Sequence, residues 1–151
     1  MPSINDYMMQ DHAACDARFE RAADAARSAS WAALQSEAGA FLDHIARHIE
    51  LEEDLLFPAF EHDAGMSSGG PTGTMRSEHQ QMQPIFAQMR AAAEARDAAA
   101  YLDAAQALHE LLQQHNMKEE LMMYPMLDQS LGAEAAAAMV DKLRRALSET
   151  A

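Results

Sequence analysis

Apolar residues recur along this chain every three to four positions, the spacing that places side chains on one face of an α-helix. The pattern predicts four long helices, over residues 4–27, 31–57, 74–96 and 98–125, and a shorter one over 133–148. Ser3, Ser30 and Asp97 stand where N-cap residues are expected. Residues 63–73 are rich in Gly and Ser and predict a loop between the second and third helices.

Four long helices with mostly short connections favour antiparallel neighbours. We therefore expect an all-α fold, an up-down-up-down four-helix bundle with the short fifth C-terminal helix packed outside it. Alanine, leucine, methionine and glutamate dominate the composition and β-branched residues are scarce, which also favours helices. At 151 residues, the chain has the length of a single domain, taken here as 1–151.

A sequence motif occurs twice and divides the chain into two related halves. His48, Glu52 and Pro58 return as His115, Glu119 and Pro125, at a constant offset of 67 residues (115 − 48). The same offset carries His12 onto His79 and Phe19 onto Phe86, well outside the motif. The bundle is therefore expected to have a pseudo-twofold axis, with the two motifs facing each other across the core.

The polar residues of the motif are predicted to point inward. Residues four apart lie on one helix face, and apolar residues at helical spacing mark that face as the buried one: Phe41, Ile45, Leu55 and Leu56 around the first motif, and Leu108, Leu112, Met122 and Met126 around the second. An ionised carboxylate buried without a partner costs at least several kcal/mol, and a cation between the helices removes that penalty.

The donor set indicates the kind of metal and the number of ions. Imidazole with carboxylate suits iron, zinc or manganese better than calcium or magnesium. The expected ligands fall into two sets, which suggests two ions about 3.5–4 Å apart. Glu52 and Glu119 would bridge the ions, His12 and His48 would bind one, and His79 and His115 the other.

Two further features of the motifs are interpreted as structural. Glu53 and Glu120 follow the motif glutamates and point about 100° away around the helix, so we expect them on the solvated surface. Pro58 and Pro125 lack an amide hydrogen and are expected to kink or end their helices.

The paired motifs resemble those of the hemerythrin-like family of HHE cation-binding domains, over roughly residues 5–128. The resemblance implies a four-helix bundle that encloses a non-haem di-iron centre. Family members commonly carry a histidine four residues after the one at position 79, where this chain has Gln83. His44 lies one turn before His48, and either binds a metal ion in compensation or lines the pocket and hydrogen-bonds a carboxylate.

The leading functional hypothesis is a di-iron protein that binds O2, or a related ligand such as NO or peroxide, as a sensor, carrier or iron store. Met82, Phe86, Met89 and Met122 would form an apolar wall that limits water access. A redox enzyme that reduces peroxide or NO, or that donates iron for iron–sulfur repair, is the second hypothesis. A zinc-bound or metal-free structural module is the third, and whether the chain is an enzyme stays open.

Charge and cysteine content restrict the partners and the compartment. The net charge of −13 argues against nucleic acid or an anionic membrane surface as a partner, because both require a basic face. A lone cysteine, Cys15, excludes an intramolecular disulfide and fits the cytoplasm. No apolar run approaches the ~20 residues that span a bilayer. The sequence does not indicate an oligomeric state.

Overall fold

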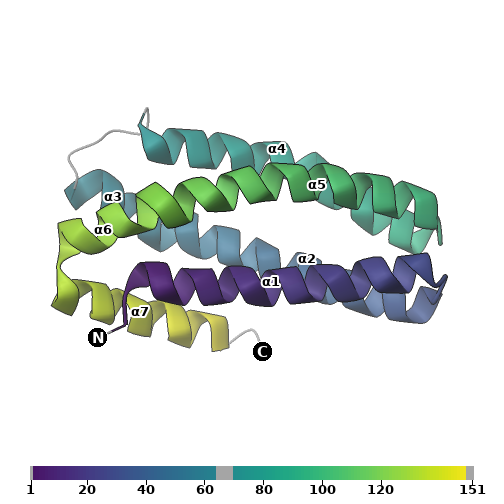
Figure 1. Ribbon diagram of the computed structural model, residues 1–151, viewed down its shortest axis with the longest axis horizontal. Helices are drawn as coiled ribbons and strands as arrows, with labels where there is room; N and C mark the ends of the chain where they lie inside the picture. Colours follow the sequence, from purple (N-terminus) through teal and green to yellow (C-terminus); the bar gives the residue numbers. More distant parts are fainter. Residues whose placement is uncertain (1, 64–69, 149–151) are drawn as a thin grey trace.

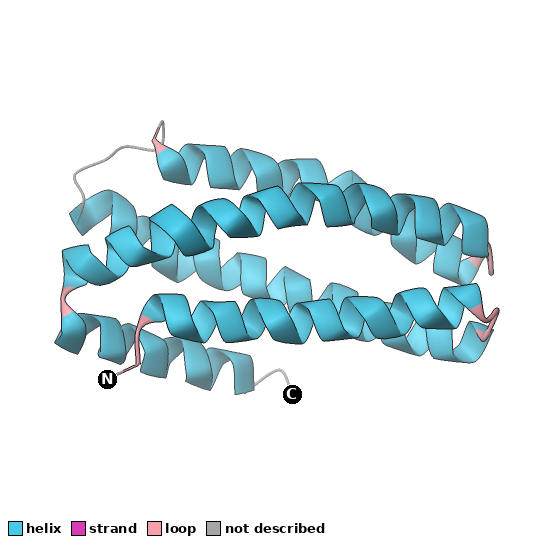
Figure 2. Ribbon diagram, viewed as in Figure 1, coloured by secondary structure: helices cyan, strands magenta, loops and turns pink. Residues whose placement is uncertain are grey.

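The computed structural model describes residues 2–63 and 70–148, and its helices form a four-helix bundle with an additional C-terminal helix (Figures 1 and 2). The predicted all-α fold is thus confirmed. The helices are α1 (Ile4–Arg27), α2 (Trp31–Leu51), α3 (Phe57–Asp63), α4 (Pro71–Glu94), α5 (Ala98–Lys118), α6 (Tyr124–Leu131) and α7 (Ala133–Ser148), with π-helical segments η1 (Glu52–Leu56) and η2 (Glu119–Met123).

The bundle consists of two helical hairpins. Helices α1 and α2 form one, α4 and α5 form the other, and the hairpins meet where α2 packs on α4 and α1 on α5. Figure 1 shows both hairpin turns at one end of the bundle and α3, α6 and α7 at the opposite end. Each half of the repeat therefore supplies one hairpin.

The two hairpin turns have the same backbone conformation. Ala29 and Arg96, which are 67 residues apart (96 − 29), both have positive φ, at 54° and 56°. In each turn the following amide donates to a carbonyl five residues earlier, from Ser30 to Ala25 and from Asp97 to Ala92, at 2.9 Å. This is the hydrogen bond of a Schellman C-cap, here with a non-glycine residue in the left-handed conformation. The repeat therefore extends to the turns.

A single π-helical turn follows each motif histidine. The Phe57 amide donates to the carbonyl of Glu52, and the Tyr124 amide to that of Glu119, five residues back instead of four. Such turns hold one extra residue and commonly occur at functional sites. On a regular α-helix Glu119 and Tyr124 would point about 140° apart, whereas here both are fully buried.

The π turns account for two departures from the sequence predictions. Pro58 and Pro125 do not end the helices, because each lies in the first turn of the α-helix that resumes after the bulge, where no amide hydrogen is needed. Leu55 is half-buried and packs against the core, in the predicted inward direction. Met122 and Met126 are 44 % and 38 % exposed, so they do not face the core, and Met122 cannot belong to the apolar wall.

The third long helix begins earlier than predicted. Residues 64–69 of the expected loop lie outside the described residues, and α4 starts at Pro71, with Gly70 as its N-cap. Proline is well suited to this first helical position. Ser3 and Asp97 cap α1 and α5 through their side chains as predicted, whereas the Ser30 side chain makes no capping bond.

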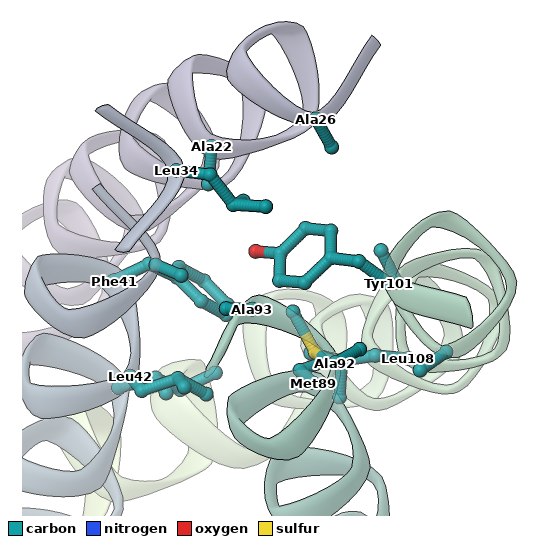
Figure 3. Packing of buried hydrophobic residues seen from close by; sticks show 14 of the residues in the cluster. Ala22, Ala26, Leu34, Phe41, Leu42, Met89, Ala92, Ala93, Tyr101 and Leu108 are labelled. Atoms are coloured by element: carbon teal, nitrogen blue, oxygen red, sulfur yellow. The ribbon is translucent and has the colours of Figure 1, made fainter. Parts of the chain in front are cut away.

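The apolar core has two parts, and the motif residues lie between them. Along α1, Met8 belongs to one part and Cys15 to the other, with His12 in between. Along α4, Met75 and Met82 flank His79 in the same way. Figure 3 shows the part near the hairpin turns, where Tyr101 packs among Ala22, Ala26 and Leu34. A polar layer therefore crosses the middle of the bundle.

Helix α7 covers the other part of the core. Its buried residues Ala136, Val140 and Leu143 belong to the same apolar cluster as Ile4 and Phe60, and α7 packs on α1, α2 and α6. The carboxylate of Asp128 accepts hydrogen bonds from the first amides of α1, at 2.8 and 3.0 Å. The fifth helix thus closes the end of the bundle opposite the hairpin turns.

Candidate metal centre

Two buried carboxylates and two histidines form one half of a candidate metal centre. The Nε2 atoms of His79 and His115 are 3.2 Å apart. His79 Nε2 is 3.1 Å from Glu52 Oε1, and His115 Nε2 is 3.3 Å from Glu119 Oε2. Both glutamates are fully buried and both histidines are 2 % exposed. One potential ligand atom from each of the four lies within 4.8 Å of the others, close enough to surround one ion.

The other half contains His12, His48 and Glu119. The Nε2 atom of His12 is 3.2 Å from Glu119 Oε1, and that of His48 is 3.6 Å from Glu52 Oε1. These three residues form a second buried group that could hold an ion. Glu119 belongs to both groups, with Oε1 beside His12 and Oε2 beside His115.

Each of these four histidines is held by an outer carboxylate. The Nδ1 atom donates to the carboxylate, which leaves the Nε2 lone pair directed into the centre. The pairs are His12 with Glu120 at 2.6 Å, His48 with Asp11 at 2.6 Å, His79 with Glu53 at 2.7 Å and His115 with Glu78 at 2.8 Å. Such carboxylate–histidine pairs are a common feature of metal sites.

The expectation that Glu53 and Glu120 are solvated surface residues is wrong. A side chain turned about 100° from the bundle axis faces the neighbouring helix instead of water. Glu53 accordingly accepts from His79 on α4, and Glu120 accepts from His12 on α1. Their side chains remain 33 % and 27 % exposed, so each lies at the edge of the centre.

The other two outer carboxylates, Asp11 and Glu78, were not predicted from the sequence. Asp11 and Glu78 are related by the 67-residue offset (78 − 11), and each immediately precedes one of the early histidines. Each supports a histidine of another helix, and Lys118 in turn donates to Glu78. An acidic residue conserved in both copies of the repeat was the signal that could have identified them.

His44 and Gln83 do not reach the centre. His44 Nε2 donates to Asp11 Oδ1 at 2.9 Å, the carboxylate contact that was the alternative to metal ligation. Among the described residues, the one potential metal group that includes His44 contains Asp11 and Cys15 and lies beside the centre. Gln83 is exposed, and its amide makes a long contact of 3.5 Å with the His79 carbonyl.

Without a metal, protonated histidines balance the negative charge of the buried glutamates. Burial alone would lower the pKa of His12 and of His115, but the Glu119 carboxylate, 3.2 and 3.3 Å from their Nε2 atoms, raises both to about 9. Burial and then the charge of Glu119 raise the pKa of Glu52. The protonated imidazoles therefore occupy the electrostatic role that a cation would take.

Unpaired polar atoms show that the residues fit a cation. Within the described residues, both carboxylate oxygens of Glu119 and the Nε2 atom of His48 are buried and make no hydrogen bond, and the contacts of Glu119 with His12 and His115 are ion pairs only when those imidazoles are protonated. Leaving such groups without a partner is costly, most of all for an ionised carboxylate. Metal coordination would satisfy all three atoms. The arrangement has the ligand types, burial and outer hydrogen bonds of a transition-metal site.

A cleft beside α1 and α5 leads to the His12 half of the centre. Its volume is about 540 Å³, and its lining combines apolar and polar side chains, among them His12, Phe19, His109, Leu112, Asn116 and Glu120. His109 is half-buried here and stacks on Phe19, with a ring separation of 5.8 Å. The cleft gives solvent a path toward the polar layer.

The chain was compared with known proteins. A family model described as the hemerythrin HHE cation binding domain matches residues 3–127, and a second match covers residues 70–149. The comparisons with curated proteins and with solved structures gave no match. Within the described residues, no helix has the length and apolar character to cross a membrane.

Proposed function

Because the chain belongs to the hemerythrin family of HHE cation-binding domains, we propose that it is a non-haem di-iron protein that binds O2 or a related small ligand such as NO or peroxide. It would act as a sensor, carrier or iron store. The observation that carries the proposal is that three buried atoms make no hydrogen bond among the described residues and could coordinate a cation. They are the two oxygens of Glu119 and the Nε2 atom of His48.

The proposed ligands divide between two ions. His12, His48 and Glu119 hold one, and His79, His115, Glu52 and Glu119 hold the other. Histidine and carboxylate donors suit iron, zinc and manganese alike, and the family resemblance favours iron. When bound, the iron pair supplies the attachment point for the small ligand and the electrons for its reduction.

The protein's own residues orient the donors and control access. The outer carboxylates fix the four imidazoles with Nε2 inward, and so keep the donors in place before an ion arrives. Met82, Ile45 and Ile49 border the centre and reduce the number of water molecules that reach it. Met89 lies deeper in the apolar core and Phe86 packs against it from a half-buried position. The cleft on the His12 side is the route by which a small ligand would enter.

Anaerobic reconstitution with Fe(II) followed by air tests the proposal. We expect two irons per chain and new near-ultraviolet and visible charge-transfer bands when air is admitted. Glu119→Gln should bind fewer than two irons, because a neutral amide replaces the shared carboxylate. Glu110→Gln, an exposed change on the same helix, should behave as the wild type. Two irons without new bands, or no iron at all, would refute the proposed function.

A redox enzyme at the same centre is the second candidate. The size of the cleft favours it, because repeated turnover requires substrate and product to reach His12 from solvent. Reduction of peroxide or NO by the iron-loaded protein, above a metal-free control, is the measurement. Reduction rates equal to those of the metal-free control would exclude this enzymatic function. Metal analysis of protein from iron-replete cells tests a zinc or manganese occupant.

A further inference from the structure

Tyr124 places a hydroxyl group in the polar layer of the bundle. The side chain is fully buried. Its hydroxyl donates to Glu52 Oε2 at 2.5 Å and lies 3.4 Å from His12 Nε2. From these contacts, and on the basis of the proposed function, we propose that the oxygen of Tyr124 is a further metal ligand, in the half of the centre that contains His12 and His48.

The number of donors in each half supports this assignment. Four residues surround the position between His79 and His115, but only three form the group that contains His12 and His48. Protein zinc sites, for comparison, are usually four-coordinate, and a site with three protein ligands takes its fourth from water or substrate. The Tyr124 oxygen would bring the second group to four as well.

The distances are compatible with ligation at a shared ion. Two donors that each bind one ion at about 2.0–2.2 Å lie roughly 3 to 3.5 Å apart. The 3.4 Å between the Tyr124 oxygen and His12 Nε2 falls in this range. The contact with Glu52 is too short for two ligand atoms on one ion and is a hydrogen bond. On ligation, an oxygen–metal bond replaces the O–H bond, the hydrogen bond to Glu52 is broken so that the two oxygens move apart, and the proton is released to solvent.

The repeat shows that the hydroxyl is not required by the scaffold. The residue equivalent to Tyr124 in the first half is Phe57, at the same offset of 67 (124 − 57). Phe57 stacks on His79, with ring centroids 5.6 Å apart and an interplanar angle of 17°. Both rings follow a π turn and both are fully buried. An aromatic ring is therefore sufficient to pack this position, and the oxygen is an addition to one half only.

Tyr101 provides a matched comparison within the same protein. It is also fully buried, but its hydroxyl lies in the apolar core and has no hydrogen-bond partner among the described residues. Figure 3 shows that hydroxyl directed toward the α1–α2 side of the core. Tyr124 differs because its oxygen faces a carboxylate and an imidazole that are themselves proposed ligands.

Ferric protein, prepared by Fe(II) loading and oxidation in air, tests the inference. Tyrosine is a known oxygen donor to ferric iron, and a phenolate ligand gives a broad visible charge-transfer band and phenolate ring modes in the resonance Raman spectrum. We expect Tyr124→Phe to lose the band and the ring modes while it keeps two irons per chain. Tyr101→Phe should retain both signals at wild-type intensity.

The outcomes separate the inference from the proposed function. Two irons per chain without phenolate ring modes, or with modes that persist in Tyr124→Phe, would overturn the ligand role of Tyr124 alone. Failure to bind iron would refute the proposed function and the inference with it. If Tyr124→Phe does not fold, wild-type protein with ring-deuterated tyrosine decides, repeated in Tyr7→Phe and Tyr101→Phe. Isotope-shifted modes that survive both changes support Tyr124, and their absence overturns it.

Discussion

Asp11→Asn is the sharpest test of how the outer carboxylates act on the centre. Asp11 is buried and accepts from two histidines, His48 Nδ1 at 2.6 Å and His44 Nε2 at 2.9 Å. Burial alone would raise the pKa of this carboxyl, but the two histidine hydrogen bonds hold it well below its usual range. Asp11 is therefore ionised at neutral pH and accepts through both oxygens.

Asparagine has nearly the same shape but only one acceptor oxygen, and its amide nitrogen donates. If that nitrogen faces His48, the imidazole must carry its proton on Nε2, the atom directed at Glu52. The lone pair needed by the metal is then blocked. Loss of such an outer carboxylate typically lowers metal affinity about 10–100-fold. This corresponds to about 1.4–2.8 kcal/mol of binding free energy.

Metal affinity of Asp11→Asn can be measured by competition with a chelator of known affinity. Asp24→Asn is the matched control, because Asp24 lies on the same helix, is 73 % exposed and pairs only with the exposed Arg27. Circular dichroism verifies that the helices of both variants are intact. A folded Asp11→Asn protein whose affinity is within twofold of the wild type would refute the assigned role of this carboxylate.

Three further predictions concern His44, pH and α7. The His44→Ala variant should keep the metal content and spectrum of the wild type, because His44 contacts Asp11 and not the centre. Loss of an ion would show that His44 is a ligand. In metal-free protein, the pKa of about 9 for His12 and His115 lies above the usual 6.5. These protonated histidines therefore stabilise the folded metal-free protein fully below about pH 6.5, and their contribution is lost as the pH rises through 9. The Tm should fall over this range, and a Tm that rises would contradict the prediction. Leu143→Ala should cost about 2–5 kcal/mol in chemical denaturation without changing metal stoichiometry, and a cost below 1 kcal/mol would show that α7 is not firmly docked.

The fold was predictable because each local signal agrees with the bundle. The apolar spacing, the caps at Ser3 and Asp97 and the 67-residue repeat all indicate two equivalent hairpins. The inward direction of His48 and Glu52 followed from their spacing of four on a regular helix. His48 precedes the π turn and Glu52 is its first residue, so the α-helical geometry used for them was correct.

Predictions for the residues that follow Glu52 and Glu119 were less accurate, because the spacing of apolar residues does not reveal the extra residue of the π turn. Regular helical geometry places Met122 on the buried face and gives no reason for Tyr124 to lie beside Glu119, whereas Met122 is exposed and Tyr124 is buried. The outer carboxylates were missed for another reason. The direction of a side chain relative to its own helix does not show which neighbouring helix it meets, so the contact of Glu120 with His12 required the packed bundle.

The π turns also determine how this centre could be transplanted into a designed scaffold. Idealised helices are straight and hold the same number of residues in every turn. If the histidines and glutamates were grafted onto such rods, Tyr124 and the residues after it would be rotated by roughly a quarter of a turn from their present direction. The bulge must therefore be copied together with the ligands, because one surplus residue on each of two helices determines which side chains share the interior.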